Sequence, residues 1–127
     1  MPTKVITKNA RGESGEKEIF DRGVMKMILA TLDAADRITQ TEDGDIEEFV
    51  AVDKAGKELV RVRENYKKGR STIHFDGKTY TKVDRYFVDG RINHRITDAE
   101  SSESMNTINE REFSELYGIM AVRSLTR

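Results

Sequence analysis

The sequence predicts an α+β fold in which an antiparallel β-meander is flanked by an N-terminal and a C-terminal helix. Glycine turns punctuate the middle of the chain, the runs between them are rich in Val, Ile, Phe, Tyr and Thr, and apolar residues on either side recur with helical spacing. A length of 127 residues lies within the usual size of one domain, roughly 100–150 residues. We therefore expect residues 1–127 to form a single domain with helices packed on one face of a sheet.

The N-terminal third predicts a short strand followed by a long amphipathic helix. Lys4–Lys8 is the candidate strand, and Asn9–Gly15 is a polar loop. Along Glu16–Ile38, residues recur at intervals of three and four, which places them on one stripe of a helix. The members of this stripe are Phe20, Val24, Met27, Ile28, Thr31, Leu32 and Ala35. The acidic segment Thr39–Asp45 is expected to be a loop.

The meander is predicted from three turns, at Lys54–Lys57, Asp76–Lys78 and Asp89–Arg91. Asp-Gly between β-prone runs is a strong hairpin signal, because a type I′ turn needs a positive φ at both central residues. The strands expected on either side of these turns are Glu47–Asp53, Glu58–Glu64, Thr72–Phe75, Thr79–Val88 and Arg91–Thr97.

The C-terminal part predicts a serine-rich acidic loop, Asp98–Asn106, and a helix, Asn109–Ser124. Two overlapping patterns are candidate caps for this helix, Thr107-x-x-Glu110 and Asn109-x-x-Glu112. The apolar face of the helix consists of Phe113, Leu116, Tyr117, Met120 and Ala121.

These patterns also predict a core and a dimer. The residues expected to be buried are Phe20, Ile28, Leu32, Val60, Ile73, Phe75, Ile92, Leu116 and Met120. A chain with few apolar residues that still places Met25, Ile28, Tyr117 and Met120 on helices is expected to cover part of these stripes with a second copy. We therefore expect at least a homodimer through helix contacts.

The composition narrows the functional classes. Charged residues make up 35% of the chain but the net charge is only −1, so no bulk field favours nucleic acid or an anionic membrane. There is no cysteine, which fits a reducing compartment. The longest apolar stretch, Val24–Leu32, is too short to cross a bilayer. We expect a cytoplasmic protein without a membrane partner.

No catalytic, metal or cofactor motif is recognisable in the sequence. The two histidines, His74 and His94, fall in different predicted hairpins, and single histidines on strands are usually structural. An enzyme that uses His94 with a nearby carboxylate stays open as an alternative, but we favour a protein that is not an enzyme and needs no cofactor.

The most informative polar pattern is cationic. In the predicted strand Glu58–Glu64, alternation places Val60 and Val62 on one face and Arg61 and Arg63 on the other, with the two arginines about 7 Å apart. One interpretation is a solvated sheet face with cross-strand salt bridges. The other is an anion site built from these guanidinium groups, which suit phosphate or carboxylate. In that site, the residues expected to contact an aromatic base are Asn93 and either Tyr86 or Phe87, and Lys26 and Arg111 would contribute from the flanking helices.

The order of these residue types resembles that of the phage Thoeris anti-defence sponge proteins. The residues that carry the resemblance are Lys26, Arg61, Phe87, Asn93 and Arg111. The resemblance implies a viral protein that acts as an oligomer in the host cytoplasm and binds a cyclic ADP-ribose-type signal without cleaving it.

We therefore predict a small, non-enzymatic binding protein that sequesters an anionic nucleotide-derived signal. Its predicted ligand-binding residues are Lys26, Arg61, Arg63, Phe87, Asn93 and Arg111. Besides the enzyme, two alternatives stay open: a nucleic-acid-binding protein that uses Lys67, Lys68 and Arg70, and an inhibitor of a host system that binds a protein partner. The near-neutral charge counts against nucleic acid.

Overall fold

The computed structural model describes the backbone of residues 3–8, 14–88, 91–96 and 106–125, and the side chains of residues 18–82 and 106–125. Two helices and nine strands make up this part of the chain. In chain order they are β1 (Thr3–Lys8), β2 (Ser14–Ile19), α1 (Arg22–Asp33), β3 (Arg37–Asp43), β4 (Ile46–Val52), β5 (Glu58–Asn65), β6 (Arg70–Phe75), β7 (Lys78–Val88), β8 (Arg91–Ile96), β9 (Asn106–Asn109) and α2 (Glu110–Leu125).

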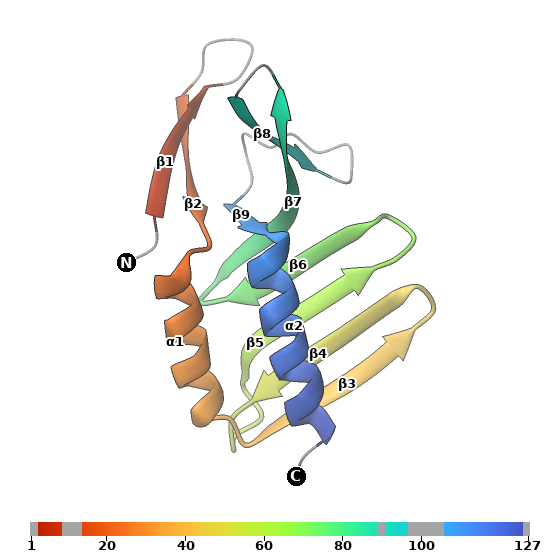
Figure 1. The fold of residues 1–127 in the computed structure, drawn as a ribbon. Coiled ribbons are helices and arrows are strands. Elements are labelled where there is room, and N and C mark those ends of the chain that lie inside the picture. Colours follow the sequence, from red (N-terminus) through yellow and green to blue (C-terminus); the bar gives the residue numbers. More distant parts are fainter. Residues whose placement is uncertain (1–2, 9–13, 89–90, 97–105, 126–127) are drawn as a thin grey trace.

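The strands form one mostly antiparallel sheet in the order β1-β2-β9-β7-β6-β5-β4-β3, and β8 pairs with β7. Strand β9 is the exception, because it runs parallel to both of its neighbours, β2 and β7. Both helices lie on the same side of the strands β3 to β7 (Figure 1). The predicted α+β class is therefore confirmed. We call the side of the sheet that the helices cover the inner face and the opposite side the outer face.

The first helix is shorter than predicted, because both ends of Glu16–Ile38 belong to strands. Residues 16–19 are part of β2, which pairs with β1, and residues 37 and 38 begin β3. The helix starts where the side chain of Asp21 accepts a hydrogen bond from the Val24 N–H, with an Oδ1–N distance of 3.1 Å. This cap satisfies an otherwise unpaired donor of the first turn and fixes the boundary. The buried face of the 12-residue helix consists of Val24, Met25, Ile28 and Leu32. The predicted stripe is therefore confirmed at Val24, Ile28 and Leu32, whereas Met27 is exposed and both Phe20 and Ala35 lie outside the helix.

The predicted acidic loop Thr39–Asp45 is wrong. Most of it is the edge strand β3, which joins β4 through a two-residue turn at Gly44 and Asp45. Gly44 has a φ of 60°, a conformation that glycine adopts without strain. The sequence did not predict this strand because Ile38 is its one buried residue. The other residues are polar on both faces, so no alternation of apolar and polar residues is visible.

The turn at Asp76 and Gly77 is confirmed as the predicted hairpin. The two residues have φ values of 53° and 72°, as a type I′ turn requires. The turn at Lys54–Lys57 also joins two paired strands, with Gly56 at a φ of 84°. The predicted turn at Asp89 and Gly90 lies outside the described residues.

The C-terminal helix agrees with the prediction to within one residue at each end, but the strand before it was missed. Thr107 is buried in β9, so the cap assigned to Thr107 is wrong. The other candidate is confirmed, because Asn109 Oδ1 accepts a hydrogen bond from the Glu112 N–H at 2.8 Å. Of the predicted acidic loop 98–106, Asn106 belongs to β9 and the rest lies outside the described residues.

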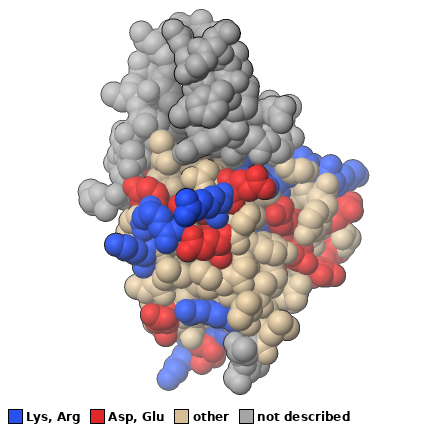
Figure 2. All heavy atoms as spheres, in the orientation of Figure 1, with Lys and Arg blue, Asp and Glu red and all other residues tan. Residues whose placement is uncertain are grey.

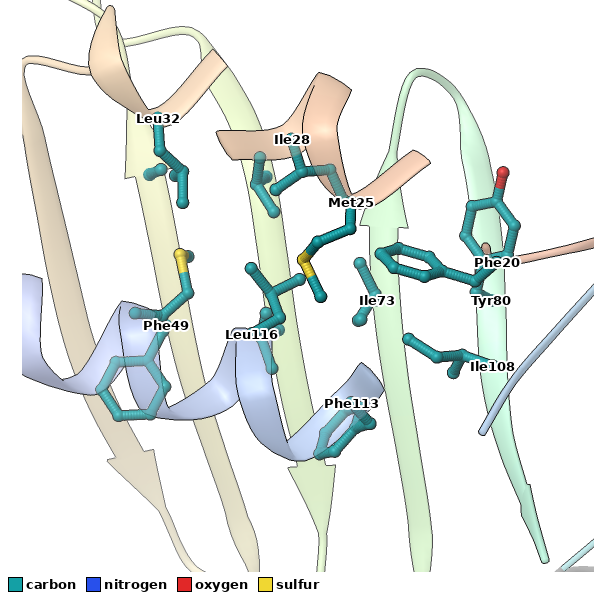
Figure 3. Packing of buried hydrophobic residues seen from close by; sticks show 14 of the residues in the cluster. Phe20, Met25, Ile28, Leu32, Phe49, Ile73, Tyr80, Ile108, Phe113 and Leu116 are labelled. Atoms are coloured by element: carbon teal, nitrogen blue, oxygen red, sulfur yellow. The ribbon is translucent and has the colours of Figure 1, made fainter. Parts of the chain in front are cut away.

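The core fills the space between the inner face and the two helices (Figure 3). The predicted core residues Phe20, Ile28, Leu32, Val60, Ile73, Leu116 and Met120 are all buried. The prediction is wrong for Phe75, which is half-buried at the margin of the core. The side chain of Ile92 lies outside the described part. The Phe20 and Tyr80 rings meet edge to face, with centroids 5.3 Å apart, an arrangement that aromatic pairs favour.

The core also removes the reason for a dimer through the helices. Met25, Ile28 and Met120 are fully buried within this one chain, and the Tyr117 ring packs edge to face on Phe49 at 5.2 Å. The chain's own sheet covers the stripe that was expected to need a second copy. Neither helix in the described part of the chain has the length and apolar character that a membrane span requires.

Candidate functional site

The outer face of β5 carries the arginines that the sequence singled out. Val60 and Val62 are fully buried on the inner face, so alternation directs Arg61 and Arg63 outward. Both faces of this strand are therefore as predicted. The two arginines differ in the carboxylates that they contact.

Arg61 is held by carboxylates. Its Nη1 donates to Glu48 at 2.8 Å, its Nε donates to Glu58 at 2.9 Å, and its Nη2 also contacts Glu58. The hydrogen bonds of Glu58 are the main reason that the pKa of Arg61 is raised. The interpretation as a solvated face with cross-strand salt bridges therefore describes Arg61, and through Glu48 it describes Arg63 as well.

Arg63 shares one of these carboxylates. Its Nε donates to Glu48 Oε2 at 3.0 Å, because Glu48 lies directly opposite Arg63 in the register of β4 and β5. Burial opposes ionisation of Glu48, but hydrogen bonds and charges from Arg63 and Arg61 outweigh it and lower the pKa of this carboxyl. One carboxylate is thus shared between two guanidinium groups.

A hollow of about 530 Å³ lies next to this network on the outer face. It is lined by Arg63, Asn65, Lys68, Arg70, Thr72, His74, Gly77, Lys78, Thr79, Thr81 and Asn106. The sheet register brings them together, because Arg63 lies opposite Thr72, Thr72 opposite Thr81, and Asn65 opposite Arg70. Every described residue that lines the hollow is neutral or cationic. We call it the outer-face pocket.

The turn between β5 and β6 places the cationic end of this pocket. The Oδ1 of Asn65 accepts a hydrogen bond from the Lys68 N–H at 3.1 Å, and Gly69 has a φ of 64°. An Asn side chain that bonds to the backbone a few residues on stabilises a turn. The turn therefore presents Lys68 and Arg70 on the same side of the sheet as Arg63.

The other end of the pocket carries uncharged polar groups beside Lys78. His74 Nδ1 lies 2.9 Å from the Thr79 hydroxyl. Burial lowers the pKa of His74, and the charges of Arg61 and Arg63 lower it further, against weaker opposition from Glu58 and Glu48. Since its ordinary pKa is 6.5, His74 is neutral at pH 7. Thr72 and Thr81 add hydroxyl groups beside it.

Lys78, like Arg63, is paired with a carboxylate that does not line the pocket. Its Nζ lies 3.0 Å from Glu18 Oε1, and the other oxygen of Glu18 accepts a hydrogen bond from the Tyr80 hydroxyl at 3.0 Å. Burial and this carboxylate raise the pKa of Tyr80. The cations that line the pocket are Arg63, Lys68, Arg70 and Lys78.

The six predicted ligand-binding residues do not meet in one site. Arg63 lines the outer-face pocket and Arg61 lies beside it. Lys26 and Arg111 are exposed on α1 and α2, on the opposite side of the sheet. Figure 2 shows that side, on which acidic and basic side chains are interleaved. On it, Arg22 of α1 bridges Glu112 and Glu115 of α2 at 2.8 and 2.6 Å.

The remaining two predicted residues, Phe87 and Asn93, belong to β7 and β8, and Asn93 lies opposite Tyr86 in the register. Their side chains, like that of His94, lie outside the described part. For His74, the Thr79 contact agrees with a structural role.

Sequence reasoning missed most of the pocket. It named Lys68 and Arg70 only for nucleic acid, and it left out the polar residues of β6. A signal was available, because Arg70, Thr72 and His74 alternate along β6 opposite the buried Ile73. Pairing this strand with β5 would have placed that row beside Arg63.

The described residues contain no cluster of His, Cys, Asp and Glu side chains that is arranged to hold a metal ion. No protein-family model matches the chain, and neither a curated protein nor a solved structure matches it.

Proposed function

We propose that this protein is a non-enzymatic binding protein that sequesters a small anionic, nucleotide-like ligand in the outer-face pocket. The observation that carries the proposal is the lining of that pocket, in which Arg63, Lys68 and Arg70 gather at one end, and neutral polar groups lie with Lys78 at the other. A phosphate group would bind at the cationic end. The hydroxyl and amide groups at the other end would contact a sugar or base.

Size and charge support a ligand of this class. A volume of about 530 Å³ lies within the usual range of small-molecule sites, roughly 300–1,000 Å³. Arginine and lysine donors form charge-assisted hydrogen bonds to phosphate, each contributing about 1.5–3 kcal/mol. The donors sit on a sheet and on a hydrogen-bonded turn, which reduces the conformational entropy that binding must overcome.

The first test is binding measured by isothermal titration calorimetry. The panel consists of inorganic phosphate, pyrophosphate, nucleoside monophosphates and diphosphates, cyclic nucleotides and a short single-stranded oligonucleotide. Lys68→Ala and Arg70→Ala should each weaken the best nucleotide at least about tenfold. Lys54→Ala is the matched control, since Lys54 is also an exposed lysine on a hairpin turn but does not line the pocket.

A second variant tests the pocket by a gain of affinity. Glu48→Gln removes the carboxylate that Arg63 and Arg61 share, so Arg63 would have more charge to offer the ligand. We expect binding to become several times tighter. Equal effects of Lys68→Ala and Lys54→Ala, or no binding by any member of the panel, would contradict the proposal.

Two outcomes would favour the alternatives. Preference for the oligonucleotide, with an affinity that falls steeply with salt, would indicate a nucleic-acid-binding protein. Turnover of a nucleotide would indicate an enzyme, and in that case His74→Ala and His94→Ala would be compared.

A further inference from the structure

We propose that β3 is the dimer interface, and that it pairs antiparallel with β3 of a second copy so that the two sheets become continuous. The proposal is independent of the outer-face pocket, which lies around β5, β6 and β7. Its motive is that β3 ends the sheet in the described part of the chain, where it pairs with β4 on one side.

An edge strand of this kind offers an unused set of backbone groups. Every second residue of β3 directs its N–H and C=O away from β4, and such a row is a template for pairing with another strand. Six of its seven residues are exposed or half-buried, so the strand is accessible. Its register with β4 is unbroken from Arg37 to Asp43.

The sequence of β3 is complementary to itself in one register. When two copies pair around a twofold axis at Gln40, Arg37 lies opposite Asp43 of the second copy, and Thr39 lies opposite Thr41. All four of these residues lie on the same face of the strand, because successive side chains alternate. The interface then holds two Arg–Asp pairs and two Thr–Thr pairs, both of which stabilise antiparallel neighbours.

The contacts within one chain leave this arrangement possible. Arg37 has a loose contact to its neighbour Asp36, at 3.6 Å, with 44% of the Arg37 side chain exposed. Gln40 bonds at 3.3 Å to Glu47, which keeps Gln40 over its own sheet and off the facing strand. Ile38, which is buried beneath the helices, stays in the core of its own copy.

A charge exchange tests both the interface and its register. Sedimentation velocity of the full chain over a dilution series should show a dimer at tens of micromolar. Arg37→Asp and Asp43→Arg each place like charges opposite each other twice in the dimer. Each should weaken dimerisation at least about tenfold. The double variant Arg37→Asp/Asp43→Arg restores both pairs and should dimerise like the wild type.

The rescue is specific, because residues 37 and 43 of one copy lie at opposite ends of β3. Lys57→Asp, a reversal at an exposed position outside β3, is the control and should leave the dimer unchanged. A monomer at all concentrations, or a double variant that is no better than the singles, would overturn the proposal.

Hydrogen–deuterium exchange of the wild type provides a second measurement that needs no variant. The backbone amides of β3 should become more protected as the protein concentration rises, while those of the Lys67–Arg70 turn should not change. Protection that is independent of concentration would also overturn the proposal.

Discussion

The two faces of the sheet are built from the same strands but depend on the sequence in different ways. On the inner face, each residue needs only to be apolar and to point inward, as Val62 and Ile73 do. On the outer face, what a residue does depends on its neighbours across the strands. Arg61 and Arg63 are two residues apart and equally cationic, but the first is held between two carboxylates while the second also lines a hollow.

The comparison implies that stability comes mainly from the inner face. The largest loss of stability should therefore follow from truncating a side chain that is buried there. Leu116 of α2 is fully buried, whereas Leu125 of the same helix is 82% exposed. Leu116→Ala should lower the free energy of unfolding by about 2–5 kcal/mol, because it removes buried methyl groups and leaves a cavity. Leu125→Ala should change it by less than about 0.5 kcal/mol. Urea denaturation followed by circular dichroism measures both, and equal losses would show that α2 does not cover the core.

A sharper comparison makes the same substitution, valine to alanine, on each face of the sheet. Val62 is fully buried on the inner face, and Val50 is half-buried on the outer face of the neighbouring strand. Val62→Ala should cost about 2–3 kcal/mol of unfolding free energy, since the side chain loses its full apolar burial. Val50→Ala should cost at most about 1 kcal/mol. Similar losses measured by urea denaturation would mean that the outer face is also covered, for example by a second copy or a ligand.

The same contrast explains how much the sequence could predict. The residue patterns identified both helices, six of the strands in the described part (β1 and β4 to β8) and most of the core, because burial against one layer imposes a simple rule on alternate or every third and fourth residue. It failed where an element is not amphipathic over its whole length. Strand β3 buries only Ile38, and β9 is four residues long and pairs with strands far away in the sequence.

The candidate site could be predicted only in part, for a related reason. Alternation correctly placed Arg61 and Arg63 on the outer face. It could not tell that Glu48 and Glu58 would engage Arg61, because that depends on the register between β4 and β5 and on one turn. It also grouped Lys26 and Arg111 with these arginines, although the sheet separates them. Residue type and order carry no information about which face of a sheet a helix will cover.

The smallest effect we predict is a pH dependence that belongs to the outer face. Burial and the charges of Arg61 and Arg63 lower the pKa of His74 below its ordinary 6.5. The unfolded chain therefore binds this proton more readily than the folded one, and folding stability decreases as the pH falls below 6.5. His74→Gln keeps a hydrogen-bonding group near Thr79 but has no proton to take up, so its stability should decrease less over the same interval.

The measurement is the urea midpoint of the wild type and of His74→Gln at about pH 7 and about pH 5.5. All other titratable groups are common to both proteins. Their contributions therefore cancel in the difference. A wild type that loses more stability than the variant would show that burial and the neighbouring charges lower the pKa of His74 in the folded protein. Identical losses would mean that folding leaves the proton affinity of His74 unchanged, as it would if solvent reached the ring and screened it from the arginines.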